Sequence, residues 1–283
     1  MRLWLPASIV MLWGFLALVS PLLPLNPHAI DLANILTPPN ATTWLGYDDL
    51  GRSIADRLAT GAQTSFIVSL AVVFLGVTFG GLLGATSGYL SGWVDQIFVR
   101  VVDILLAFPG LLLAIALAAA LGPGIENVIL ALGLTGWVGY ARLARAQVLS
   151  VKQADHVVAA RAIGASTWRI LTRHLLPLLT APLIVEASFG IAGAIIAEAG
   201  LSFLGLGVQP PDASWGSMIR DGTRYMLVAP HLVIIPGVTL MLVVLAANLL
   251  GDWLRDWLDV KDHITKGEKP IKAKEKIAGP GKL

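Results

Sequence analysis

Six stretches of apolar residues, separated by polar connections, follow one another along the chain. They run from about Leu3 to Leu25, Thr64 to Leu90, Phe98 to Leu121, Asn127 to Ala141, Leu178 to Ile196 and His231 to Leu250. A helix of roughly 20 apolar residues is long enough to cross the hydrocarbon core of a bilayer. The pattern therefore predicts an all-α integral membrane protein with six transmembrane helices.

The first apolar stretch follows a single charged residue, Arg2, and has two interpretations. A signal peptide would have a shorter apolar core and a small-residue cleavage site, and no A-x-A-type site is present. We therefore expect a retained transmembrane helix. The polar residues 26–63 contain Pro27, Pro38 and Pro39, which predict a loop followed by a short amphipathic helix.

The second apolar stretch has glycines four residues apart, at Gly76, Gly80, Gly84 and Gly88. Residues at this spacing share a helix face, and small residues there let a neighbouring backbone approach closely. We expect this face to pack inside one bundle, and a dedicated dimer contact is the alternative. In the third stretch, Pro109 predicts a kink.

Glu186 is an ionisable residue within the fifth apolar stretch, where charged groups are rare and often functional. Either it is hydrogen-bonded to a neighbouring helix, or it contacts a transported solute. The connection that follows, residues 198–230, is rich in Gly and Pro yet too apolar for a solvent loop. It predicts a hairpin that is partly inserted in the membrane or covered by protein.

The segment Asp155–Pro177 lies between two apolar stretches and is predicted to be a helix outside the membrane. It carries three arginines and is rich in small residues, namely Arg161, Arg169, Arg173, Ala159, Ala160, Ala162, Gly164 and Ala165. Its composition leaves two interpretations open. It is either a docking surface for a second protein or an amphipathic helix lying among lipid headgroups.

The composition supports the membrane assignment, since 56% of the 283 residues are hydrophobic and only 13% are charged. The chain has no cysteine, which excludes disulfides and thiolate metal sites. It has no G-x-x-x-x-G-K-[ST] phosphate loop and no H-E-x-x-H zinc motif. We therefore predict no catalytic residue, bound cofactor, metal site or nucleic-acid partner, and an energy source outside this chain.

The distribution of positive charge predicts the orientation. With six spans, 16 of the 20 Lys and Arg residues lie on the side of the two termini. The other four are Arg52, Arg57, Arg220 and Arg224. Without the lysine-rich tail, 261–283, nine Lys and Arg residues remain on the side of the termini, against four on the opposite side. The positive-inside rule therefore places both termini and the segment Asp155–Pro177 in the cytoplasm.

This last segment resembles the cytoplasmic coupling motif of ABC-importer permeases, E-A-A, three residues, Gly, nine residues, then I-x-L-P. Ala159, Ala160 and Gly164 match the motif, as do Leu176 and Pro177. Val158 stands at the glutamate position, with Asp155 nearby as a candidate substitute, and His174 stands at the isoleucine position.

Three further segments extend the resemblance over nearly the whole chain. Residues 44–53 are similar to the W-L-G-T-D-x-x-G-R-D pattern of dipeptide, oligopeptide and nickel permeases, with departures at Tyr47 and Ser53. Residues 200–216, GLSFLGLGVQPPDASWG, and 251–259, GDWLRDWLD, resemble signatures of the second permease subunit of such importers.

The resemblance implies a type I ABC-importer permease fold in a bacterial inner membrane. The implied partners are a homologous permease, two cytoplasmic ATPases that bind ATP and Mg²⁺, and an extracytoplasmic solute-binding protein. Residues 1–63 would form the first helix and an extracytoplasmic segment, 64–260 the core with a coupling helix at about 155–173, and 261–283 a disordered tail. Ala159, Ala160 and Gly164 would let the coupling helix fit closely into a groove of an ATPase, where Arg161 would supply a charged contact and Ala165 would lie nearby.

Two other classes of protein remain as alternatives. A stand-alone secondary transporter or channel would need paired intramembrane charges, and Glu186 has no evident partner in the sequence. An intramembrane enzyme would need a nucleophile or metal constellation, which the spacing of the five histidines does not provide. Among solutes, dipeptides, oligopeptides, nickel chelates and glutathione-like compounds all stay open, with peptides favoured.

Overall fold

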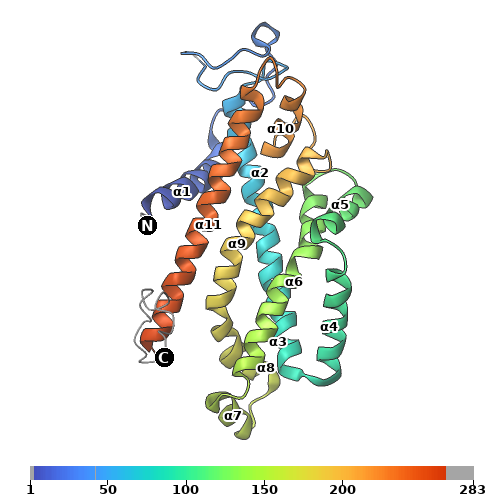
Figure 1. Cartoon of the computed structure of the whole chain (residues 1–283), viewed down its shortest axis with the longest axis vertical. Helices are drawn as coiled ribbons and strands as arrows, with labels where there is room; N and C mark the ends of the chain where they lie inside the picture. Colours follow the sequence, from blue (N-terminus) through green and yellow to red (C-terminus); the bar gives the residue numbers. More distant parts are fainter. Residues whose placement is uncertain (1–2, 42, 266–283) are drawn as a thin grey trace, which may run out of the picture.

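The computed structural model describes residues 3–41 and 43–265, and side chains as far as residue 258. This part of the chain is a bundle of helices (Figure 1). The helices are α1 Trp4–Val19, α2 Ile54–Leu75, α3 Gly81–Leu90, α4 Gly92–Leu106, α5 Gly110–Leu121, α6 Ile125–Val151, α7 Asp155–Ala162, α8 Thr167–Ile170, α9 Leu176–Phe203, α10 Trp215–Thr223 and α11 His231–Thr265. The predicted all-α class is confirmed.

Four continuous helices are long and apolar enough to cross a membrane: Trp4–Leu22, Ile54–Leu90, Thr167–Phe203 and His231–Leu258. The pair α4 and α5 passes the same test when taken together, but bends by 82° at the break between the two helices. This break lies next to Pro109, so the predicted kink is confirmed. The total of six spans stays a prediction.

The 27-residue helix α6 lies at the centre of the bundle and packs against α2, α3, α5 and α9 (Figure 1). The short helices α7 and α8 lie at one end of the bundle, and α10 lies at the other. We refer to these as the α7 end and the α10 end. One buried apolar cluster joins α3, α6, α7, α8 and α9 near the α7 end.

One predicted boundary, at residue 64, does not separate structural elements. Helix α2 begins at Ile54, capped by the Ser53 hydroxyl, and continues through the π-helical turn Gly76–Gly80 into α3. The expected short amphipathic helix before residue 64 is therefore the first part of this long helix. Within this part of the helix, Gly61 packs directly against Trp215.

The last helix is also longer than predicted. We expected the sixth span to end near Leu250, but α11 continues to Thr265. Trp253 and Trp257, one turn apart, stack with 6.1 Å between ring centroids, and Gly251 packs against Phe189 of α9. The predicted tail from 266 onwards lies outside the described residues.

The connection 198–230 is covered by protein only in part: residues 213–218 are buried, whereas residues 209–212 and 226–228 are exposed. Its first residues extend α9 to Phe203, and α10 begins with a capping box between Ser214 and Ser217. The Trp215 side chain is 1% exposed, and its Nε1 donates a 3.0 Å hydrogen bond to the Leu58 carbonyl. This contact fixes α10 against α2.

Candidate functional site

The segment at the α7 end is divided into two helices. We expected one helix over Asp155–Pro177, but α7 ends at Ala162 and α8 begins at Thr167. The break occurs because Gly164 has φ +82°, a conformation that glycine adopts without strain. The Gly164 N–H donates to the Arg161 carbonyl and the Ala165 N–H to the Ala160 carbonyl, both at 3.0 Å. These two bonds form a Schellman motif.

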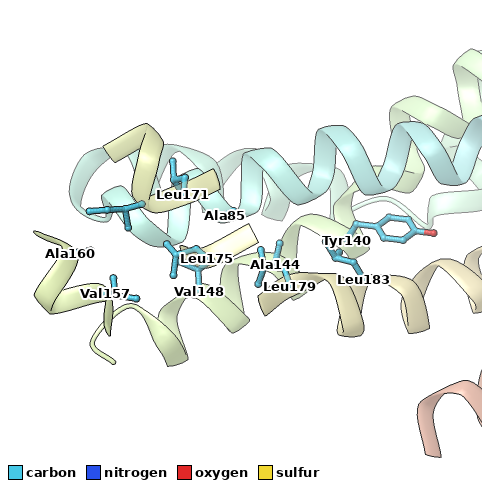
Figure 2. Packing of buried hydrophobic residues seen from close by; sticks show 11 residues of the cluster. Ala85, Tyr140, Ala144, Val148, Val157, Ala160, Leu171, Leu175, Leu179 and Leu183 are labelled. Carbon is cyan, nitrogen blue, oxygen red and sulfur yellow. The ribbon is translucent and has the colours of Figure 1, made fainter. Parts of the chain in front are cut away.

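One face of α7 is buried against the rest of the chain. Val157 and Ala160 lie in the same apolar cluster as Leu171 and Leu175 (Figure 2). Ala160 was expected to help α7 fit into a groove of an ATPase. Its burial instead gives it a contact inside this chain, where a small side chain lets α7 lie close to the following turn.

The other face of α7 and the start of α8 expose large apolar side chains. Ile163 is 86% exposed, Trp168 66% and Val158 43%, and Ala159 is also exposed. We call these four residues the α7–α8 surface. Ile163 and Trp168 were not predicted as site residues. The sequence could have indicated them, because both are large apolar residues in a segment that lies outside the predicted spans.

The remaining predicted residues of this segment flank the surface. Asp155 is exposed in the first turn of α7, where a carboxylate is favoured by the helix dipole. The Arg161 guanidinium lies over the ring of Tyr89, 5.6 Å from its centroid. Leu176 packs against the buried cluster, and Pro177 lies in the first turn of α9. The α7–α8 surface is therefore attached to α3 and α9.

An ion pair next to this segment joins α4 to α6. Arg145 donates from Nε and Nη2 to the two carboxylate oxygens of Asp95, at 2.6 and 2.7 Å. The Ser87 hydroxyl donates to the same carboxylate at 2.7 Å. The Lys152 ammonium donates to the Ser91 hydroxyl at 2.6 Å and to the Gly88 carbonyl at 3.1 Å. From the sequence, Arg145 and Lys152 contributed only to the predicted orientation, and their contacts with Asp95 and Ser91 were not predicted.

The glycine row of α2 and α3 lies against α6. A Cβ at Gly76 would meet the Tyr140 ring, one at Gly80 the Trp137 carbonyl and one at Gly84 the Ala141 carbonyl. A Cβ at Gly88 would lie 3.0 Å from the Arg145 carbonyl oxygen. The four glycines therefore let two helix backbones lie in close contact.

A cavity of about 320 Å³ lies between α2, α5, α6 and α9, and Glu186 lines it. Five glycines contribute to its wall: Gly110, Gly136, Gly139, Gly190 and Gly193. Tyr140 and Thr135 supply hydroxyl groups, and the other lining residues are apolar. Figure 2 shows the Tyr140 hydroxyl pointing away from α7.

A network of charged residues lies at the α10 end. The Asp48 carboxylate accepts a 2.7 Å bond from Arg52 Nε and lies 3.4 Å from Arg57 Nε, and both arginines are buried. Burial and the neighbouring Asp48 and Asp221 carboxylates raise the pKa of Asp49, while Arg52 lowers it. This network holds the loop before α2 against the bundle.

The departures at Tyr47 and Ser53 are compatible with this loop. The two residues form an isolated antiparallel bridge through their backbones, which does not depend on the side chains. The Ser53 hydroxyl accepts from the Asp56 N–H, so serine replaces aspartate as a helix cap.

Glu198 is a buried acid that sequence reasoning assigned to a connecting segment. It lies in α9, is 1% exposed and accepts hydrogen bonds from Ser65 of α2 at 3.1 Å and from Ser202 at 2.8 Å. The serines satisfy the carboxylate inside the protein. The sequence does not predict this contact, because Ser65 lies 133 residues from Glu198 along the chain.

Together these features define a class of protein: a multi-helix membrane protein with a cavity between its helices and an apolar surface at one end. The comparisons with known proteins specify the class further. Residues 76–261 match the family described as binding-protein-dependent transport system inner membrane component. The chain belongs to this family.

Several curated relatives match most of the chain. It is 43% identical to the probable D,D-dipeptide transport system permease protein DdpC of Escherichia coli over 256 residues, 90% of this chain and 86% of the relative. It is 44% identical to the glutathione transport system permease protein GsiD of Pectobacterium atrosepticum, over 79% of this chain and 74% of that protein. It is 41% identical to the dipeptide transport system permease protein DppC of Alkalihalophilus pseudofirmus, over 87% of this chain and 81% of that protein.

A solved structure shares the fold. A chain from the inward-facing MetNI methionine ABC transporter superposes with a TM-score of 0.58 at 18% identity, covering 71% of this chain and 95% of that one. At this identity the likeness concerns the fold alone.

Proposed function

We propose that this chain is the permease subunit of an ATP-driven ABC importer. It forms half of the pathway by which peptides, delivered by an extracytoplasmic binding protein, cross the bacterial inner membrane. The observation that carries the proposal is the α7–α8 surface, which exposes Ile163 and Trp168 beyond the ends of the long helices. Membership of the family supports a partner at this surface. We propose that this partner is a subunit that binds ATP and Mg²⁺.

The proposed topology has six spans: α1, α2 with α3, α4 with α5, α6, α9 and α11. Helix α6 has 27 residues and a length of about 40 Å, sufficient to cross a bilayer. An even number of spans places both termini on one side, and the Lys and Arg distribution makes that side the cytoplasm. The α7–α8 surface is then cytoplasmic.

The proposed coupling begins at this surface. Val158, Ala159, Ile163 and Trp168 contact the ATP-binding subunit, with Asp155, Arg161 and Ala165 beside them. Val158 supplies an apolar contact where the motif has glutamate. Gly164 fixes the turn, and Ala160 holds α7 to the buried cluster that includes Val148 of α6 and Leu179 of α9. Displacement of α7 is therefore transmitted to the helices that line the cavity.

The proposed solute class is peptides. The relatives named above are permeases for dipeptides, for D,D-dipeptides and for glutathione, which is itself a tripeptide. A homologous second permease completes the pathway, and the two permeases alternate between inward-open and outward-open states. This chain itself contributes helix packing and solute contacts, and no catalytic residue.

Uptake into reconstituted vesicles tests the proposal. The vesicles contain this chain, its partner permease, two ATP-binding subunits and the binding protein, and the solute is a labelled dipeptide. We expect uptake that requires ATP and is lost when this chain is omitted. Uptake by this chain alone under an ion gradient would contradict the proposal and favour a secondary transporter.

A further inference from the structure

The Glu186 side chain is half-buried in the wall of the cavity, and its carboxylate has no hydrogen-bond partner in the described part of the chain. It is near the middle of the continuous helix Thr167–Phe203. No hydrogen bond or ion pair joins it to another described residue, in contrast to the buried Glu198, whose carboxylate accepts from two serines. A carboxylate at membrane depth is costly unless a cation, a hydrogen-bond donor or water meets it.

The space beside Glu186 is kept open by small residues. A Cβ at Gly139 would lie 3.6 Å from Glu186 Oε1, and one at Gly190 would collide with the Tyr140 hydroxyl. A Cβ at Gly193 would meet no atom of the described part of the chain within 4 Å. Side chains at these positions would fill the cavity, so the glycines preserve a volume of about 320 Å³. Binding pockets for small molecules begin at about this size.

The cavity lies at the depth where transporters commonly bind their solutes. Val72 and Val73, in its wall, are midway along the continuous helix Ile54–Leu90. Gly110 and Leu111 belong to the wall as well, so the cavity meets the break between α4 and α5. Solute sites near the bilayer midplane are often built next to discontinuous helices.

We infer that Glu186 binds the positively charged amino group of the transported solute during its passage through the membrane. This inference rests on the proposed function and makes it more specific, because it requires peptides with a free amino terminus. Among the residues that line the cavity, Glu186 is the one with a charged side chain. The hydroxyls of Tyr140 and Thr135 are available to the ammonium group as acceptors, and the apolar wall accommodates small side chains.

The absence of cysteine from the chain allows a direct test in the assembled importer. Gly193→Cys introduces a single thiol into this chain within the cavity, where the glycine has open space. With cysteine-free partners in nanodiscs, the alkylation rate of this thiol reports whether the cavity is occupied. The solutes are di-alanine and N-acetyl-di-alanine, added without the binding protein so that its own preference does not enter.

We expect di-alanine to slow alkylation several-fold and N-acetyl-di-alanine to have no effect. Adding Glu186→Gln should abolish protection, whereas Glu186→Asp should retain part of it. Asp103→Asn, which removes an exposed acid of α4, is the matched control and should leave protection unchanged. Co-elution of each variant with the partner subunits shows that the assembly is intact.

Protection by di-alanine that is equal with and without the Glu186→Gln substitution would overturn the inference, as would equal protection by the acetylated peptide. Absence of protection in an importer that takes up di-alanine would overturn it too, while the proposed function would stand. An assembly that takes up no peptide in the vesicle assay would overturn the proposed function, and the inference with it.

Discussion

The glycines of this chain serve two different physical purposes. At Gly84 there is no room for a side chain, because a Cβ there would collide with the Ala141 carbonyl of α6. Gly164 is required by conformation, because its φ is +82° and no atom of the described residues lies within 4 Å of an added Cβ. The four-residue spacing of the glycine row predicted close packing at Gly84, whereas no pattern around Gly164 indicated its left-handed conformation.

Gly84→Ala should destabilise the bundle by forcing α3 away from α6. Overpacking of this kind costs about 1–3 kcal/mol. The measurement is the midpoint of thermal unfolding in detergent. Gly81→Ala, on the same helix, is the control because its Cβ would lie an ordinary 3.4 Å from Leu183 Cδ1. If both variants unfold at the same temperature, close contact at Gly84 is not what the glycine provides.

Gly164→Leu should uncouple ATP hydrolysis from uptake while leaving the protein in the membrane. A left-handed conformation costs a residue with a Cβ about 1–2 kcal/mol, so the turn between α7 and α8 would distort. Gly164→Asn should keep most of the uptake, since asparagine tolerates this conformation. The assay compares dipeptide uptake with ATPase activity. Normal uptake by Gly164→Leu would contradict the proposed role of this turn.

At the scale of elements, the sequence predicted the apolar helices well and their polar contacts poorly. A long apolar run indicates a span by itself, and the break next to Pro109 follows from the restricted backbone of proline. The contact of Ser65 with Glu198 and that of Asp95 with Arg145 join residues 133 and 50 positions apart. No local pattern specifies such pairs, because they arise only when the helices pack.

Asp95→Asn should loosen α4 from α6. The carboxylate accepts from Arg145 and Ser87, and a hydrogen bond to a charged group contributes about 1.5–3 kcal/mol. We expect faster proteolysis of the turn between α3 and α4. Asp103→Asn removes an exposed acid from the same helix and should leave the rate unchanged. Equal rates in the two variants would show that the ion pair does not hold the helices together.

At the scale of the whole molecule, the account depends on which side of the membrane each end faces. Leu227, between α10 and α11, is fully exposed at the α10 end, and Arg169 is exposed at the α7 end. In intact cells, an impermeant maleimide should label Leu227→Cys, and should label Arg169→Cys only after lysis. The reverse pattern would contradict the proposed orientation, and labelling of both in intact cells would contradict an even number of spans.

The α7–α8 surface lies at the end of the chain's own bundle, and its exposed apolar residues form the proposed contact with the ATP-binding subunit. Ile163 and Trp168 project from it, whereas Val157, on the opposite face of α7, is buried. The arrangement separates residues that hold the surface in place from residues available to a partner. Substitutions on the exposed face can therefore remove the contact without unfolding the bundle.

Co-purification tests this central claim most directly. The chain is isolated from its native membrane in mild detergent, as wild type and as Ile163→Asp with Trp168→Ala, and the accompanying proteins are quantified. We predict that the wild type brings down a second permease and two ATP-binding subunits, and that the double variant keeps the permease but loses the ATP-binding subunits. Recovery of the ATP-binding subunits at wild-type levels with the double variant would contradict the account, as would a wild-type chain that purifies alone.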